Sequence, residues 1–269
     1  MSQELQVGVV GLGAVGKTLV ARLDEGIFGV RLSGVSVRDP DATIESLLHL
    51  KRRVPVVRAS ELAAIADVII ECAPAHLMGE IAEPVLRAGK TLIVLSCGGL
   101  LERMDLVDLA REHGGQIIVP TGALLGLDAV TAAAEGTIHS VRMTTRKPVK
   151  GLIGAPFLIE NGININDITE PTKIFSGNAR DAAKGFPANL NVVVALALAG
   201  IGPDRTQLEI WADPSVTRNT HVIEVNSDAA SFSMSIQNIP TGNPRTGRIT
   251  AQSVLAVLRK LRSPLRVGT

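Results

Sequence analysis

Aromatic residues are scarce in this sequence, which contains no tyrosine, five phenylalanines and one tryptophan. Stacking platforms for nucleic-acid bases are therefore few. The formal net charge of +1 at pH 7 gives no electrostatic case for binding nucleic acid or an anionic membrane surface. We expect neither of them as a partner.

Cysteine is almost absent as well. The two cysteines, Cys72 and Cys97, lie in apolar runs, which argues against a disulfide framework and favours a reducing compartment. The amino terminus lacks a basic, apolar leader, and the longest apolar segment, residues 192–201, is too short to cross a bilayer. No histidine and cysteine cluster has metal-ligand spacing, so no metal is expected. We expect a cytoplasmic protein.

The first half of the chain alternates short apolar runs with segments of helical spacing. Near-continuous apolar runs of this length suit strands buried on both faces of a parallel sheet, and they fall at residues 5–10, 32–37, 54–57, 68–72, 91–97 and 116–119. Helical spacing falls between them at residues 14–25, 60–66, 77–88 and 101–113, with Ser60 as a candidate N-cap. The alternation predicts a Rossmann-type, doubly wound α/β domain over residues 1–122.

Three glycines directly follow the first apolar run, in the stretch GVVGLGAVGKTLVARL at residues 8–23. In this position Gly11 permits a tight turn, Gly13 lets a diphosphate approach the main chain, and Gly16 lets the helix pack close to the strand. The first helical residues, Ala14 and Val15, then present N–H groups and the positive end of the helix dipole. The loop predicts binding of NAD or NADP, and a purely structural turn is the alternative.

The second apolar run ends in VSVRDP, where a dinucleotide-binding domain inspects the adenosine ribose. The carboxylate of Asp39 suits a free 2′-hydroxyl group, whereas the guanidinium of Arg38 favours a 2′-phosphate. The pair predicts use of both cofactors with a lean to NADP. The alternative is that Arg38 only neutralises Asp39 at the surface.

Two further loops follow the fourth and fifth runs, where strand ends line the ligand crevice of an open α/β sheet. Ala73, Pro74, Ser96 and Gly98 are the expected neighbours of the nicotinamide ribose. Cys97 raises the possibility of a thiolate nucleophile for an aldehyde, but a cysteine after an apolar run is more often a small buried hydrophobe.

The pattern of polar and apolar residues changes after Gly122. A short helix is expected within residues 121–136, and strands that alternate polar and apolar residues follow at 139–145, 207–212, 221–225 and 232–239. The alternation predicts a mostly antiparallel sheet in a smaller α+β domain over residues 123–245, which would hold substrate in a cleft. Helical pieces at residues 178–200 are interrupted at Pro187, and a final amphipathic helix within residues 246–269 is expected to pack back on the first domain.

Several longer motifs resemble the L-aspartate dehydrogenase family across essentially the whole chain. They are GLGAVG, PTGALLGLDAV, TTRKP, FSGNARDAAKGFPANLNVVVALALAG, ADPSVTRNTHVIEV and NPRTGRITAQSVLAVLRKL. The resemblance implies NAD(P)-dependent oxidation of L-aspartate to iminoaspartate, which hydrolyses to oxaloacetate and ammonia or feeds NAD biosynthesis. It also implies a homodimer, and an architecture similar to homoserine dehydrogenase and dihydrodipicolinate reductase.

The resemblance also assigns roles to individual residues. The active-site histidine of the family falls on His221, and its cofactor contacts fall on Ala123 and on either Asn189 or Asn191. One departure is visible: a glycine–phenylalanine pair is expected after the histidine strand, and this chain has NSDAASFSM there.

Amino-acid oxidation itself requires a group that accepts a proton from the substrate ammonium, and histidine suits that task near neutral pH. His221 is the candidate and His76 its rival. A dicarboxylic substrate also needs cationic partners. Lys147 and Arg218 are preferred from a set that also includes Arg146, Lys173 and Arg245. Thr145, Thr220 and Asn189 are the candidates for neutral hydrogen bonds to the substrate.

Two other functions fit the same features. A related imine reductase of the dihydrodipicolinate type would share the glycine loop, and a catalytically silent dinucleotide sensor would bind NAD(P)H without oxidising aspartate.

Overall fold

The computed structural model describes residues 4–39, 47–187, 190–241 and 247–268. The chain divides into two compact units. The first unit comprises Met1–Pro120 and Ala251–Arg266, and the second comprises Thr121–Thr250 and Val267–Thr269. Within the described residues, no helix is long and apolar enough to cross a membrane.

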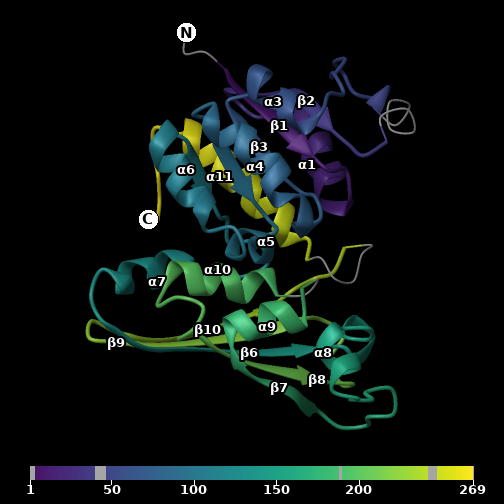
Figure 1. Cartoon of the computed structure of the whole chain (residues 1–269), viewed down its shortest axis with the longest axis vertical. Helices are drawn as coiled ribbons and strands as arrows, with labels where there is room; N and C mark the ends of the chain where they lie inside the picture. Colours follow the sequence, from purple (N-terminus) through teal and green to yellow (C-terminus); the bar gives the residue numbers. More distant parts are fainter. Residues whose placement is uncertain (1–3, 40–46, 188–189, 242–246, 269) are drawn as a thin grey trace. The chain divides into compact units, whose positions relative to one another are not determined.

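The first unit is built on a parallel sheet with the strand order β2-β1-β3-β4-β5 (Figure 1). The strands are β1 (Leu5–Val10), β2 (Val30–Ser36), β3 (Val68–Glu71), β4 (Thr91–Val94) and β5 (Gln116–Ile118). The order reverses between β1 and β3, which creates the switch point where open α/β sheets bind ligands. The predicted doubly wound α/β fold is confirmed for this unit.

Helices cover both faces of this sheet. Leu19 of α1 (Ala14–Glu25) and Val254 of α11 (Ile249–Arg262) share one buried cluster with Val7 and Val9 of β1. On the other face, a Cβ atom added to Gly8 would lie 3.0 Å from the Leu62 side chain of α3. The helices of that layer are α3 (Ala59–Ile65), α4 (Met78–Arg87) and α6 (Asp105–His113). Val7 and Gly8 thus face opposite layers, as strand alternation requires.

Several predicted elements of this unit were wrong in detail. Residues 54–57 form no strand, only a bridge between Val35 and Val56, because Pro55 has no N–H to donate. The run at 91–97 ends as a strand at Val94, and Cys97 begins the short helix α5 (Cys97–Leu101). The expected helix 101–113 is divided between α5 and α6.

The N-cap of α3 was also predicted at the wrong residue. It is Arg58 rather than Ser60. The Glu61 carboxylate reaches back and accepts a hydrogen bond from the Arg58 backbone N–H at 2.9 Å, so the helix begins earlier than the serine suggests.

The second unit contains a mixed sheet with the strand order β10-β9-β6-β8-β7 (Figure 1). The strands are β6 (Ile138–Lys147), β7 (Thr172–Asn178), β8 (Gln207–Ala212), β9 (Thr220–Ser227) and β10 (Ser231–Gln237). Three of the neighbouring pairs, β10–β9, β9–β6 and β8–β7, are antiparallel, and β6–β8 is parallel. The sheet is therefore mostly antiparallel, as predicted, although β7 was not foreseen.

Helices cover one face of the mixed sheet (Figure 1). They are α7 (Leu127–Ala134), α9 (Ala179–Gly185) and α10 (Asn191–Ala199), and a further short helix is α8 (Pro156–Glu160). On β6 the side chains of Val141, Met143, Thr145 and Lys147 are buried, whereas those between them are partly or fully exposed. This alternation assigns Thr145 and Lys147 to the buried face, at the carboxyl end of the strand.

Candidate active site

The glycine loop of the first unit has the backbone that the sequence predicts for close packing. Gly11 has a φ of +87°, and a Cβ atom there would lie 2.6 Å from the Cys72 carbonyl oxygen. A Cβ atom on Gly16 would overlap the Gly11 carbonyl oxygen. Neither position accepts a side chain without a shift of the main chain.

Gly13 differs from these two glycines. A Cβ atom there would meet nothing within 4 Å, and the residue is exposed as the N-cap of α1. Its side-chain position is therefore open space beside the first turn, where backbone N–H groups of a helix lack internal partners. The first turn of α1 carries no acidic residue. This arrangement fits the diphosphate of a dinucleotide, with Ala14 and Val15 at the helix start.

The two residues proposed to inspect the adenosine ribose lie just beyond β2. Arg38 and Asp39 are both exposed. Their place at the carboxyl edge of the sheet agrees with a role at the ribose. Which cofactor they favour stays a prediction.

The loops after β3 and β4 are joined by Ser96. Its hydroxyl group lies 2.8 Å from the Ala73 carbonyl oxygen, so the structure brings together two of the four residues expected near the nicotinamide ribose. Pro74 follows Ala73 directly and is exposed, and Gly98 lies in the first turn of α5.

Cys97 is buried and does not have the character of a nucleophile. Burial, and then the charge of Glu71, raises the pKa of Cys97 to about 12, so the thiol is protonated at neutral pH. The residue acts as a small buried hydrophobe, which was the commoner of the two interpretations.

The predicted catalytic histidine lies near the start of β9. His221 is opposite Thr145 in the antiparallel pairing of β9 with β6, and its Nδ1 atom lies 3.1 Å from the Thr145 Oγ1 atom. Both residues are buried, with 2% of His221 exposed. The hydrogen bond fixes one ring nitrogen and leaves Nε2 as the second proton-binding atom.

Lys147 lies two residues beyond Thr145 on the same buried face, and 3% of it is exposed. Burial, together with the positive charge of Lys147, lowers the pKa of His221 from its ordinary value to about 3. The imidazole is therefore neutral at pH 7. His221, Thr145 and Lys147 form the candidate catalytic cluster of the second unit.

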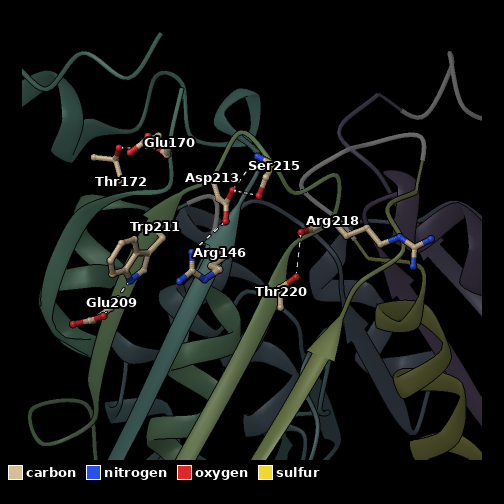
Figure 2. A network of polar contacts seen from close by, with 9 residues as sticks. All are labelled: Arg146, Glu170, Thr172, Glu209, Trp211, Asp213, Ser215, Arg218 and Thr220. Carbon is tan, nitrogen blue, oxygen red and sulfur yellow. Dashed lines mark hydrogen bonds and ion pairs between the residues drawn. The ribbon is translucent and has the colours of Figure 1, made fainter. Parts of the chain in front are cut away.

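Two other candidate substrate residues, Arg146 and Thr220, lie on the opposite face of the sheet. Thr220 is paired with Arg146, and side chains at successive strand positions point to opposite faces. Figure 2 shows Arg146 beside Trp211 and joined to Asp213, where the closest nitrogen–oxygen distance is 3.2 Å. The Arg218 side chain is exposed, and its carbonyl oxygen lies 3.5 Å from the Thr220 hydroxyl group. Arg146 and Thr220 are therefore not grouped with His221.

Three predicted cofactor contacts belong to the second unit. The Ala123 carbonyl oxygen accepts a hydrogen bond from the Asn238 side-chain amide at 2.8 Å. Asn191 is the exposed first residue of α10, and it is engaged in an interaction. Asn189 lies outside the described residues, as does Arg245.

Sequence reasoning missed two buried polar residues beside the predicted sites. Asn238, which holds the Ala123 carbonyl group, gave no signal in the sequence. Glu71 accepts hydrogen bonds from the loops after β3 and β4. A carboxylate that directly follows three buried apolar residues was a signal, because an ionisable group at a buried strand end needs several donors.

A parallel sheet with a glycine loop at its switch point, and a buried histidine in a second unit, define a dinucleotide-binding oxidoreductase. The family described as the NAD-binding domain of homoserine dehydrogenase matches residues 11–120, and the family described as the aspartate dehydrogenase C-terminal region matches residues 128–261. The first unit is accordingly an NAD-binding domain.

Two relatives extend the match to full length. The chain is 58% identical to an L-aspartate dehydrogenase of Bradyrhizobium diazoefficiens, over 100% of this chain and 95% of that protein. It is 60% identical to L-aspartate dehydrogenase 3 of Bordetella bronchiseptica, over 99% of this chain and 98% of that protein. The chain belongs to the L-aspartate dehydrogenase family.

A solved structure agrees on the fold. The crystal structure of aspartate dehydrogenase from Thermotoga maritima matches with a TM-score of 0.73 and 22% sequence identity, over 99% of this chain and 100% of that one.

Proposed function

We propose that this protein oxidises L-aspartate with NAD⁺ or NADP⁺. A hydride leaves Cα and a proton leaves the amino group, which gives iminoaspartate, NAD(P)H and one proton. Water then converts the imine to oxaloacetate and ammonia. The observation that carries the proposal is the neutral, buried His221 imidazole held by Thr145, in a chain 60% identical to an L-aspartate dehydrogenase over nearly its whole length.

The residues of the first unit would hold the cofactor. Gly11, Gly13 and Gly16, with the start of α1, would hold the diphosphate, and Arg38 and Asp39 would contact the adenosine ribose. Ala73, Pro74, Ser96 and Gly98 would contact the nicotinamide half. The family resemblance assigns further cofactor contacts to Ala123 and to an asparagine at position 189 or 191. When bound, the cofactor supplies the hydride acceptor.

The task of His221 is proton transfer. In the tautomer that carries its hydrogen on Nδ1, the ring donates to the Thr145 hydroxyl oxygen, and Nε2 is then free to take a proton from the substrate ammonium. After Nε2 has released this proton to solvent, the same nitrogen can orient and deprotonate the water that attacks the imine. The ring is neutral at the outset because burial and Lys147 hold its pKa low.

Lys147 is the proposed partner of one substrate carboxylate, and Arg218 of the other. A carboxylate beside Lys147 would offset the positive charge that lowers the His221 pKa, so binding of substrate would make the imidazole a stronger base. The exposed position of Arg218 leaves its guanidinium accessible.

The proposal also covers the oligomeric state and the cellular location. We propose a homodimer, supported by the family resemblance, and a cytoplasmic location, supported by the free thiols of both cysteines. Light scattering after size-exclusion chromatography tests the first. The ratio of reduced to oxidised thiols in protein trapped from cells tests the second.

The experiment that tests the function is a panel assay with each cofactor and with aspartate, homoserine and a cyclic imine as substrates. Formation of NAD(P)H only with aspartate supports the proposal. Reduction of the cyclic imine without aspartate oxidation would identify an imine reductase instead. Tight NADPH binding with no turnover of any substrate would identify a sensor.

A further inference from the structure

Glu71 is a buried carboxylate in the middle of the parallel sheet. It is the last residue of β3, where it lies between Val10 of β1 and Val94 of β4, and 0% of it is exposed. A buried ionisable group at this position is costly unless several donors satisfy it. We therefore looked for the hydrogen-bond donors that satisfy this carboxylate.

Main-chain donors from two loops surround this carboxylate. Oε1 accepts a hydrogen bond from the Ala73 N–H group at 2.7 Å, and Oε2 accepts from Leu95 and Ser96 at 3.1 and 2.8 Å. Ala73 follows β3, whereas Leu95 and Ser96 follow β4. One side chain thus fixes the start of both loops, and we call this set of four residues the Glu71 clasp.

The Ser96 hydroxyl group adds a fourth connection. Its oxygen lies 2.9 Å from Glu71 Oε1 and 2.8 Å from the Ala73 carbonyl oxygen, and it has one hydrogen to donate. Burial outweighs these hydrogen bonds and raises the pKa of Glu71. If Glu71 is protonated on Oε1, it donates to the Ser96 hydroxyl oxygen, which in turn donates to the Ala73 carbonyl oxygen, so both short contacts are hydrogen bonds. If Glu71 is ionised, the one hydroxyl hydrogen serves only one of the two oxygens.

The two loops held by the Glu71 clasp contact each other and the glycine loop. A Cβ atom on Gly11 would lie 2.6 Å from the Cys72 carbonyl oxygen and 3.2 Å from the Ala73 nitrogen. A Cβ atom on Gly99 would lie 2.6 Å from the Ala75 carbonyl oxygen. The loop after β3 therefore lies in direct main-chain contact with the loops after β1 and β4.

The strand order decides which half of the cofactor these loops serve. The sheet reverses between β1 and β3, and the adenosine ribose is inspected at the end of β2. The other half of the dinucleotide must then extend over the ends of β3 and β4. We infer that Glu71 is a positioning residue that sets the two loops for the nicotinamide half of the cofactor.

This inference rests on the dinucleotide use in the proposed function and not on aspartate as the substrate. The glycine turn has its own anchor, because the Gly11 N–H group donates to the Ser36 carbonyl oxygen at 2.8 Å. The adenosine and diphosphate part of the site is therefore held without Glu71. Loss of the clasp should weaken NADPH binding and spare the binding of ADP.

Calorimetry without substrate tests this separation. In Glu71→Gln the side-chain NH₂ group must face a main-chain donor, so at least one N–H group loses its acceptor. We expect the Kd of NADPH to rise at least tenfold, and the Kd of ADP to change by less than about threefold. Ser96→Ala removes only the hydroxyl group and should raise the NADPH Kd by about threefold to fivefold. It also keeps the test available if Glu71→Gln does not fold.

The matched control is Glu102→Gln, which makes the same substitution at an exposed residue at the end of α5 and should change neither Kd. Equal weakening of ADP and NADPH in Glu71→Gln, or unchanged binding of both, would overturn the inference. A lower melting temperature with an unchanged ratio of the two Kd values would reduce Glu71 to a structural role and overturn it as well. Failure of the unsubstituted protein to bind NADPH, NADH or ADP would instead count against the proposed function.

Discussion

The Nδ1 atom of His221 lies 3.1 Å from the Oγ1 atom of Thr145, and the two residues face each other across β9 and β6. The pair is buried on the helix-covered side of the mixed sheet. A ring held at Nδ1 can rotate little, so Nε2 keeps one direction. The register of two strands therefore determines where the proposed base accepts its proton.

Removal of the Thr145 hydroxyl group should lower turnover more than substrate binding. In Thr145→Val the imidazole loses its orienting partner in a buried setting, a loss worth about 0.5–1.5 kcal/mol. We expect kcat to fall about threefold to tenfold with little change in the KM for aspartate. Thr144→Val is the matched control, because Thr144 is the preceding residue on the other face of β6. Equal kinetics for the two variants would show that the hydrogen bond does not orient the ring.

The low pKa of His221 predicts a specific loss of stability in acid. Unfolding returns the group from a pKa of about 3 to its ordinary value of 6.5, so below pH 6.5 the unfolded chain takes up a proton that the folded chain excludes. Stability is therefore lost as pH falls through this window, by up to about 1.4 kcal/mol per pH unit.

Urea unfolding at about pH 7, 6 and 5 measures this effect, above the range in which most carboxylates titrate. His221→Gln removes the titrating ring. Its free energy of unfolding should fall less steeply as the pH is lowered, and the difference in slope should approach the value for uptake of one proton, about 1.4 kcal/mol per pH unit. The same pH dependence in both proteins would show that protonation of His221 does not contribute to the loss of stability in acid.

Loss of the imidazole itself should have the largest kinetic effect. His221→Ala should lower kcat for aspartate oxidation by about 10²–10⁴-fold, the usual range for a general acid–base group. NADPH binding, measured by fluorescence, should change little. The exposed His76 is the matched comparison, and His76→Ala should keep nearly normal turnover. The reverse order of the two effects would transfer the role to His76.

Much of the fold could be predicted because hydrophobic periodicity and glycine position are local signals. The bounds of β1 and α1 agree with the predicted residues 5–10 and 14–25. Strand β7 was missed because its register shifts between Lys173 and Phe175, so Ile174 and Phe175 are both buried and the alternation is broken. A local pattern cannot show a bulge that only the neighbouring strand defines.

The candidate site was predictable in its residue types but not in its partners. His221 and Lys147 were named from the sequence, and the structure adds that they share a buried face with Thr145. Thr220 was named from the same motif as His221, yet it is one residue earlier in the strand and so faces the other side. Two of the main-chain donors to Glu71, those of Leu95 and Ser96, directly follow the neighbouring strand β4, 24 and 25 residues further along the chain.

Cofactor preference should respond to the residue after the second strand. If Arg38 contacts a 2′-phosphate, Arg38→Ala should lower the ratio of kcat/KM for NADP⁺ to that for NAD⁺ by about tenfold. Arg31→Ala removes an exposed arginine from β2 itself and should leave the ratio unchanged. Steady-state kinetics with both cofactors measures it. An unaltered ratio in Arg38→Ala would show that Arg38 does not select the cofactor and would favour the alternative that it only neutralises Asp39.

The glycine loop predicts two alanine variants with opposite defects. A methyl group on Gly16 would overlap the Gly11 carbonyl oxygen, so Gly16→Ala should lower the free energy of unfolding by about 1–3 kcal/mol. A methyl group on Gly13 would meet nothing within 4 Å and would stand where the diphosphate approaches. Gly13→Ala should therefore change stability by less than about 0.5 kcal/mol while it raises the Kd of NADPH at least tenfold.

Urea unfolding and calorimetric NADPH binding, measured on both variants, separate the two effects. Each variant serves as the control for the other, since both replace one loop glycine by the same residue within a single turn. Normal NADPH affinity in Gly13→Ala would mean that the open space beside α1 is not where the diphosphate lies. In that case Gly11 and Gly16 would be explained by chain packing alone, because their contacts are with the protein's own main chain.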